Sequence, residues 1–236
     1  MEEINRARAL LAGAGRIVTF SGAGLSAESG IATFREVQTG LWAQYDPTEL
    51  ASPEGFARNP ALVIDWYNDR RRKLSSAWPN AAHEALARRD DLTHVTQNVD
   101  HLLEAAGAAR VLHLHGRIDS DRCHRSCGFE TPVDIAKPPS LRSCPRCGAP
   151  MRPSVVWFGE TLPSVVWEMA VEAVVAADAL LVVGTSGVVF PAAGLIDLAH
   201  RSNTSIIVVN AEPIRSPANV RLIGSAAELV PMILPE

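Results

Sequence analysis

A strand that runs directly into a glycine-rich turn constrains the fold of this chain more than any other feature. The stretch from Val18 to Arg35 begins apolar and continues through Gly22, Ala23 and Gly24. Small residues at a strand end let the backbone approach an anion closely, and the N-terminus of a following helix favours negative charge. Gly22 and Gly24 also begin the dinucleotide-binding spacing G-x-G-x-x-G/A. The stretch predicts a phosphate site, and a glycine-rich turn without a ligand is the alternative.

The residues after this turn differ from those of a dehydrogenase, which continues into an unbroken helix, a second strand and an acidic residue about 20 positions later. Here Ser29 and Gly30 interrupt any helix early, and no β-branched run precedes Pro47. We therefore expect the loop to fold over its ligand. Hydride transfer is accordingly the least favoured enzymatic activity.

Strand-like segments alternate with helical segments along most of the chain. We expect strands at 16–20, 92–96, 111–114, 155–160, 179–183 and 204–209, and helices at 4–12, 60–77, 79–87, 101–106, 163–177, 191–201 and 226–234. Such alternation is typical of an α/β fold in which helices cover both faces of a parallel sheet. The 236 residues suffice for one large α/β domain with a small insert.

Polar residues follow several of these strands at the point where each strand ends. Gln97, Asn98 and Asp100 follow one strand, and His115 follows the next. Ligands of open parallel sheets bind at this carboxyl edge. Singly, Asn98 or Asp100 can cap a helix and a strand-end His can be a packing residue, but three successive strand ends carry such groups. We therefore predict a binding site there. Two later strand ends carry small polar groups suited to ribose and phosphate, in Gly184-Thr185-Ser186 and Asn210-Ala211-Glu212.

All four cysteines lie in residues 117–153, a segment without a long apolar period. Cys123 and Cys127 form one pair, and Cys144 and Cys147 form the other. Two thiolate pairs at this separation are typical of a tetrahedral structural zinc site. A redox CxxC, a catalytic zinc and ligation by His124 are less favoured alternatives. Arginines make the segment locally basic, which leaves contact with a polyanion open: Arg117, Arg122, Arg125, Arg142, Arg146 and Arg152.

The overall composition argues against several classes of protein. The net charge is −4, so nucleic-acid binding would have to rest on a local patch. Apolar runs such as 179–183 are too short to cross a bilayer. The first residues lack the basic start and apolar core of a signal peptide. We expect a monomeric cytoplasmic protein that does not associate with membranes.

Together these motifs resemble the sirtuin family of NAD-dependent protein lysine deacylases. The resemblance covers almost the whole chain and follows the family's order: Gly22 to Ile31 with Phe34-Arg35, Thr96 to Asp100, Leu114-His115-Gly116, the four cysteines, Gly184 to Ser186, and Asn210. It implies a Rossmann-like NAD-binding domain (1–35, 79–116 and 154–236), a helical insertion (36–78) and a zinc-binding module (117–153). One departure is the first cysteine pair, which has three intervening residues where the family usually has two.

The resemblance also implies that NAD is consumed as a co-substrate and that the acyl group passes from lysine to ADP-ribose. His115 matches the family's general base, and Asn98 would take part in catalysis and line the ribose pocket. The other NAD-binding residues would be Gly22, Ala23, Gly24, Ser26, Gly30, Ile31, Phe34, Arg35, Trp42, Gln97, Val99, Asp100, Gly184, Thr185, Ser186, Asn210, Ala211, Glu212 and Ala226. The substrate peptide would lie as an added strand against Val156, Phe158, Gly159, Glu160, Gly187 and Val188.

Tyr67 and Arg70 lie three residues apart on one face of the helix expected at 60–77. An Arg on an apolar stripe usually extends its guanidinium to solvent, and residues 71–73 are expected to form a solvated face. A phenol and a guanidinium that face a pocket instead suit a carboxylate, which the Arg fork binds through two hydrogen bonds. Tyr-x-x-Arg resembles the signature of sirtuins that prefer succinyl and malonyl groups. We therefore predict desuccinylase and demalonylase activity, with deacetylase activity as well.

Other functions stay open at this point. They are a plain NAD-dependent deacetylase, an ADP-ribosyl transferase that uses the same NAD site and, from a different class, an NAD-sensing module that binds nucleic acid through the zinc-binding segment. The expected partners are proteins with acylated lysines, and the net charge of −4 disfavours nucleic acid.

Overall fold

A computed structural model of the chain describes residues 1–31 and 45–234. Three of the predicted NAD-binding residues, Phe34, Arg35 and Trp42, lie outside the described residues. Within the described ranges, no helix is long and apolar enough to cross a membrane.

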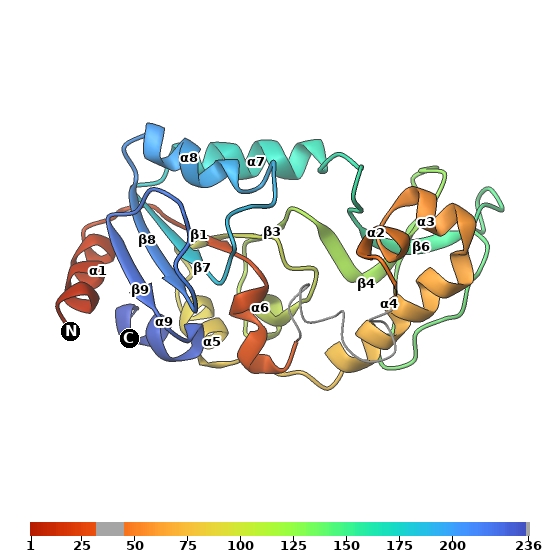
Figure 1. Cartoon of the computed structure of the whole chain (residues 1–236), viewed down its shortest axis with the longest axis horizontal. Coiled ribbons are helices and arrows are strands. Elements are labelled where there is room, and N and C mark those ends of the chain that lie inside the picture. The colour runs from red at the N-terminus through yellow and green to blue at the C-terminus, as the bar shows by residue number, and fades with distance from the viewer. Residues whose placement is uncertain (32–44, 235–236) are drawn as a thin grey trace.

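The larger of two sheets is parallel throughout and has the strand order β3-β2-β1-β7-β8-β9 (Figure 1). The parallel sheet predicted from the sequence is confirmed. The strand order reverses between β1 and β7, and open α/β sheets bind ligands at such a switch point. The strands are β1 (Ile17–Ser21), β2 (Thr93–Thr96), β3 (Val111–His113), β7 (Ala179–Val183), β8 (Ser205–Asn210) and β9 (Val220–Ile223). The edge strand β9 is missing from the expected strands, because it is only four residues long and follows a polar stretch without a helical segment before it.

Helices cover both faces of this sheet, as expected (Figure 1). One face packs against α1 (Glu2–Ala12), α5 (Ala81–Ala87), α6 (Leu102–Ala105) and α9 (Ala226–Ile233). The other face packs against α7 (Ser164–Val175) and α8 (Gly194–Arg201). After β1, the glycine-rich turn forms two single 3₁₀ turns, η1 (Ala23–Leu25) and η2 (Ala27–Ser29), which Gly30 ends with a φ of 79°. The continuous helix of a dehydrogenase is absent from this described part of the turn, as predicted.

The smaller sheet is antiparallel and has the order β5-β4-β6, with β4 at Gly116–Cys123, β5 at Glu130–Pro132 and β6 at Met151–Val155. The sequence predicts no strands inside 117–153, because β4 is largely polar and pairs with a segment far along the chain. The strand expected at 155–160 is wrong. β6 ends at Val155, and the Glu160 N–H donates to the Trp157 carbonyl across a turn in which Gly159 has a φ of 84°.

Three helices pack against the smaller sheet: α2 (Pro47–Leu50), α3 (Pro53–Arg58) and α4 (Pro60–Leu74). Two of them begin at side-chain caps, because Ser52 accepts a hydrogen bond from the Gly55 N–H and Asn59 accepts one from the Leu62 N–H. The predicted start of α4 is confirmed, and the helix ends at Leu74 instead of Ala77. Apolar side chains from α4, β4 and β6 share one core. The insertion helices and the antiparallel sheet therefore pack as one unit beside the large sheet.

Arg71 corrects the prediction that residues 71–73 form a solvated face. Its side chain is fully buried and forms an ion pair with Asp121 of β4, with 2.6 Å between Nη2 and Oδ1. Its Nε also donates to the Ile118 carbonyl at 2.8 Å. Position 71 follows Tyr67 by four residues and therefore lies on the buried stripe of α4. Arg71 ties α4 to β4, whereas Arg72 and Lys73 are exposed as expected.

Removing this buried cation is expected to destabilise the protein. Arg71→Met leaves the buried Asp121 carboxylate with Arg142 alone, and breaking one side of a buried ion pair costs about 3–5 kcal/mol. Denaturant unfolding in the presence of zinc measures this loss. The exposed neighbour gives the matched control, because Arg72→Met should change the free energy of unfolding by less than about 0.5 kcal/mol. Equal effects of the two variants would contradict the buried ion pair.

Candidate active site and metal site

The glycine turn meets the end of β7 at the switch point of the large sheet. The Gly24 N–H donates to the Gly184 carbonyl at 2.8 Å. A Cβ atom on Gly24 would lie 2.7 Å from the Gly184 Cα, and one on Gly184 would lie 2.3 Å from the Leu25 nitrogen. These glycines are therefore needed for two backbone segments to touch. This contact brings together two of the segments predicted to bind NAD.

The residues that follow β2 extend this contact through side chains. The Gln97 amide donates to the Thr185 hydroxyl at 2.8 Å, and the Asn98 amide donates to Ser26 Oγ at 3.2 Å. Ser26 Oγ in turn donates to Asp100 Oδ2 at 3.1 Å. Three strand ends that are distant in the sequence are thus linked, as the parallel-sheet rule predicts.

His115 follows β3 and has a defined tautomer. Its Nδ1 lies 3.0 Å from the Gln97 carbonyl oxygen, and a carbonyl only accepts, so Nδ1 carries the proton. Nε2 is therefore the basic nitrogen. Burial lowers the pKa of His115 from its ordinary value, partly offset by the hydrogen bond to Gln97. The ring is a neutral imidazole at pH 7, which is the form a general base needs.

The end of β8 meets the turn before α9, and this turn also contacts η2, the second 3₁₀ turn of the glycine-rich segment. The Asn210 amide donates to the Glu212 carbonyl at 2.7 Å, and the Asn210 carbonyl accepts from the Gly224 N–H. Ser225 caps α9 and donates to the Glu28 carboxylate of η2. The predicted residues Ala211 and Glu212 are exposed, whereas Ala226 is buried at the start of α9 and packs in the core. Ile31 and Val99 pack against the core of the smaller unit.

Tyr67 is buried on α4, and Arg70, three residues further along the helix, is half-buried. Arg70 Nε and Nη1 are buried and have no hydrogen-bond partner among the described residues, so this guanidinium does not simply extend to solvent. Its Cζ lies 4.9 Å from the centre of the Trp66 ring. Burial lowers the pKa of Arg70, and Tyr67 and Asp100 oppose this shift by their proximity.

The segment predicted to hold a substrate peptide is irregular. The N–H groups of Val156 and Phe158 donate to the carbonyls of His115 and Ala51, both at 2.9 Å, so these two N–H groups are already used within the chain. Glu160 is held within the chain by Arg122 at 3.0 Å and by Arg152. Phe158 and Val188 are largely exposed, and Gly159 and Gly187 both have positive φ. The structure thus places an anchoring carboxylate and two exposed apolar side chains here.

Sequence reasoning missed Trp157, whose indole Nε1 donates to the Tyr67 hydroxyl at 2.9 Å. It also missed His83, whose Nε2 lies 3.4 Å from Ser26 Oγ. A signal for Trp157 exists, because it stands between two predicted substrate residues, but strand alternation directs it to the opposite side. His83 carries no comparable signal, since its spacing on α5 is that of an ordinary buried residue.

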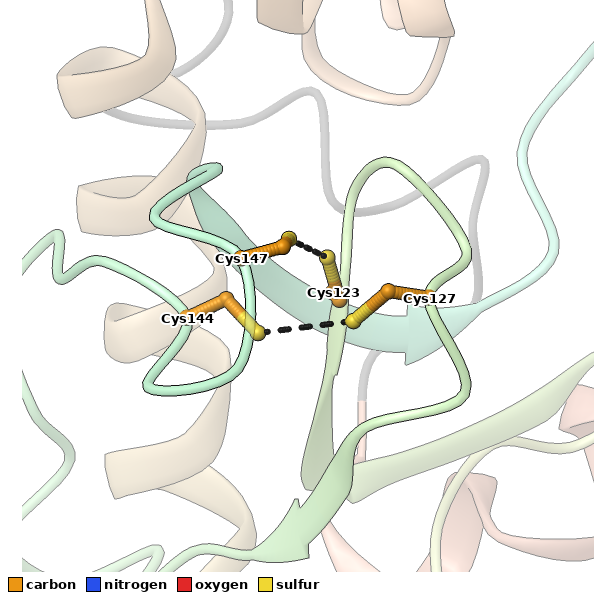
Figure 2. Close-up of side chains that lie close together, drawn as sticks. All are labelled: Cys123, Cys127, Cys144 and Cys147. Carbon is orange, nitrogen blue, oxygen red and sulfur yellow. Dashed lines mark hydrogen bonds between the residues drawn. The ribbon is translucent and has the colours of Figure 1, made fainter.

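Figure 2 shows the four cysteines facing one another, with Cys123 at the end of β4, Cys127 in the loop after it, and Cys144 and Cys147 in the loop before β6. Their sulfur atoms all lie within 4.8 Å, with 3.4 Å between Cys123 and Cys147 and 3.6 Å between Cys127 and Cys144. Tetrahedral zinc with Zn–S bonds of about 2.3 Å needs sulfurs about 3.8 Å apart. The site therefore fits a structural zinc ion. The extra residue of the first pair is accommodated by Ser126, which has a φ of 53°.

The other ligands considered for this segment do not join the cluster. Among the described residues, the candidate metal group contains cysteines alone. The His124 ring instead packs against Phe56, with 4.9 Å between ring centres. Much of the basic charge is neutralised, since Arg117, Arg122, Arg142 and Arg152 each pair with a carboxylate.

A parallel sheet with ligand-binding groups at its switch point, beside a four-cysteine metal module, defines a nucleotide-binding α/β protein with a zinc-binding unit. The Sir2 family model matches residues 22–191. A Pseudomonas aeruginosa protein named NAD-dependent protein deacylase 1 is 47% identical, over 95% of this chain and 95% of its own. A solved complex of a Sir2 homologue with NAD has a TM-score of 0.91 at 42% identity, covering 97% of this chain and 92% of that one. A structure of Sir2Af2 bound to a myristoylated histone peptide has a TM-score of 0.79 at 35% identity, covering 99% and 95%.

The chain belongs to the Sir2 family and is an NAD-dependent protein deacylase of the sirtuin type. The predicted family, fold class and enzyme class are confirmed. This family assignment replaces the dehydrogenase as the explanation of the site.

Proposed function

We propose that this enzyme removes succinyl and malonyl groups, and acetyl groups as well, from protein lysines, with NAD as co-substrate. The observation that carries the proposal is Arg70, whose Nε and Nη1 are buried without a partner among the described residues. Buried polar groups are normally paired, and an unpaired cation is costly. A carboxylate at the end of the acyl chain supplies the missing partner in a geometry that the Arg fork matches.

The strand-end residues supply the rest of the site. NAD, when bound, provides ADP-ribose as the acyl acceptor and nicotinamide as the leaving group. We assign its pyrophosphate to the glycine turn at Gly22–Gly24, the ribose and nicotinamide to Gln97, Asn98 and Asp100, and the adenosine to the ends of β7 and β8. His115 Nε2 takes the proton of a ribose hydroxyl, since Nδ1 is already committed to the Gln97 carbonyl.

We also propose a role for each part of the chain, a cellular compartment and the partners of the enzyme. We assign NAD binding to 1–35, 79–116 and 154–236, the acyl pocket to 36–78 and the zinc site to 117–153. The cysteines converge on a metal site and not on disulfides, which suits a reducing cytoplasm. The expected partners are acylated proteins, with the enzyme acting as a monomer.

Acyl preference is tested by kcat/KM for matched acetyl-, succinyl- and malonyl-lysine peptides with saturating NAD. We expect the wild type to favour the acidic acyl groups and Arg70→Met to lower the succinyl-to-acetyl ratio of kcat/KM about 10- to 100-fold, because a charged hydrogen bond contributes about 1.5–3 kcal/mol. Arg72→Met, on the exposed side of α4, is the control and should leave the ratio unchanged. A wild type that prefers acetyl, with a ratio that Arg70→Met does not alter, would make Tyr67 and Arg70 a packed helix face and the enzyme a plain deacetylase.

A further inference from the structure

The Tyr67 hydroxyl has a fixed hydrogen-bonding role before any substrate binds. Its oxygen lies 2.9 Å from Trp157 Nε1. An indole N–H can only donate, so the phenol oxygen must accept and its own proton is left to point elsewhere. Among the described residues, the hydroxyl makes no other hydrogen bond. Burial raises the pKa of Tyr67, which keeps the proton on the oxygen at neutral pH.

Contacts on several sides hold the Trp157 indole in the orientation from which its N–H donates to Tyr67. The Arg152 guanidinium lies over the indole, with Cζ 3.9 Å from the ring centre. The Phe56 ring packs at 5.3 Å from it. The Trp157 backbone N–H donates to Glu160 Oε2 at 2.9 Å, and the side chain is 2% exposed. A rotation of the indole would break the stacking with Arg152 and leave its N–H buried without a partner.

We propose that Trp157 is a specificity-determining positioning residue, which occupies the acceptor side of the Tyr67 hydroxyl and thereby makes it a donor for the carboxylate of an acidic acyl group. This inference rests on the proposed succinyl and malonyl activity. A carboxylate only accepts hydrogen bonds, so Tyr67 and Arg70 together present donors alone. An acyl chain that ends in a donor meets a hydroxyl whose acceptor side is already occupied by the indole N–H, whereas a free phenol could turn to accept.

The test is a double-mutant cycle that reads the succinyl-to-acetyl ratio of kcat/KM. The variants are Trp157→Phe, Tyr67→Phe and the double variant. We expect Trp157→Phe to lower the ratio about fivefold, mainly through KM for the succinyl peptide, and Tyr67→Phe to lower it at least about tenfold, or about 1.4 kcal/mol. Adding Trp157→Phe to Tyr67→Phe should lower the ratio no further, because the indole acts through the phenol.

Two controls separate positioning from general packing. Phe56→Leu loosens the contact with the indole but keeps its N–H, so the ratio should stay at the wild-type value even where both activities fall. Site-specific incorporation of 3-benzothienylalanine at position 157 keeps the bicyclic shape and removes the N–H. It should lower the succinyl-to-acetyl ratio of kcat/KM about as much as Trp157→Phe does. It also supplies the test of the N–H if the Phe variant folds poorly.

The inference is overturned if removal of the indole N–H lowers succinyl and acetyl turnover equally, or if it lowers the ratio further in the Tyr67→Phe background. Its failure can be distinguished from failure of the proposed function. If Arg70→Met removes the acidic preference but loss of the N–H does not, only the role of Trp157 is wrong. If the wild type has no acidic preference, both fall.

Discussion

His115→Ala is expected to lower kcat/KM for acetyl-, succinyl- and malonyl-lysine peptides alike, by about 10²–10⁴-fold, the usual contribution of a positioned general base. The imidazole is bound through Nδ1 to the Gln97 carbonyl, which leaves Nε2 as the base at the edge where the strand ends converge. Alanine removes this base without altering Tyr67 or Arg70. The loss should therefore be independent of the acyl group, unlike the loss caused by Arg70→Met.

The role of His115 as a general base also predicts how kcat/KM of the wild type depends on pH. Because burial lowers the pKa of His115, kcat/KM should rise with pH as the neutral imidazole forms, with a midpoint below the ordinary value of about 6.5. Activity should be at its plateau by neutral pH. His200→Ala, at an exposed position on α8, is the matched control and should keep both the rate and the midpoint. A His115→Ala enzyme that retains most of its deacylation, or an acid limb that persists in its residual activity, would contradict the assignment. Release of nicotinamide with transfer of ADP-ribose to an acceptor protein, without deacylation, would favour the ADP-ribosyl transferase instead.

Removing the metal is expected to unfold the antiparallel sheet and abolish activity. Structural zinc sites contribute about 10–16 kcal/mol of apparent binding free energy at pH 7, and Cys144 lies buried in a cluster that has few other apolar partners. Cys144→Ser removes a ligand, and a strong chelator removes the ion. Either should lower the melting temperature and the helical and strand signal, and added zinc should restore the chelated wild type alone.

Loss of the metal should also disturb α4, which carries the proposed acyl-binding residues. β4 carries both Cys123 and Asp121, and Asp121 holds α4 through Arg71. Metal content is measured by elemental analysis, with one zinc per chain expected for the wild type and for Ser143→Ala, the neighbouring control at an exposed position. Full activity in a sample shown to be free of metal would rule out the structural role.

Most of the predictions that the structure confirms rest on two things. One is the spacing of nearby residues, and the other is the rule that the carboxyl ends of parallel strands meet at one edge of the sheet. The cysteine pairs are close in sequence, so their spacing alone predicts the convergence of four sulfur atoms. Gln97 and Thr185 are 88 positions apart and still meet, because the carboxyl ends of parallel strands share one edge. In both cases a general geometric rule replaces knowledge of the particular partner.

Interactions between distant elements that follow no such rule could not be predicted. The stripe of α4 identifies a buried face but not the Asp121 that makes a buried Arg71 tolerable. The pairing of β4 with β6 joins polar residues about which hydrophobic periodicity says nothing. Trp157 lies just past β6 in a turn, so the alternation expected of a strand assigns its side chain to the wrong side. Its partner, Tyr67, lies 90 residues earlier.

The most direct measurement of the central claim is the wild-type arm of the acyl comparison, with the products resolved by mass spectrometry. We predict that succinyl- and malonyl-lysine peptides lose their acyl groups faster than the acetyl peptide. Each free lysine should be matched by one nicotinamide and one O-acyl-ADP-ribose, with no turnover when NAD is omitted. Faster turnover of the acetyl peptide would contradict the acidic-acyl pocket, and deacylation without NAD would contradict the assigned chemistry.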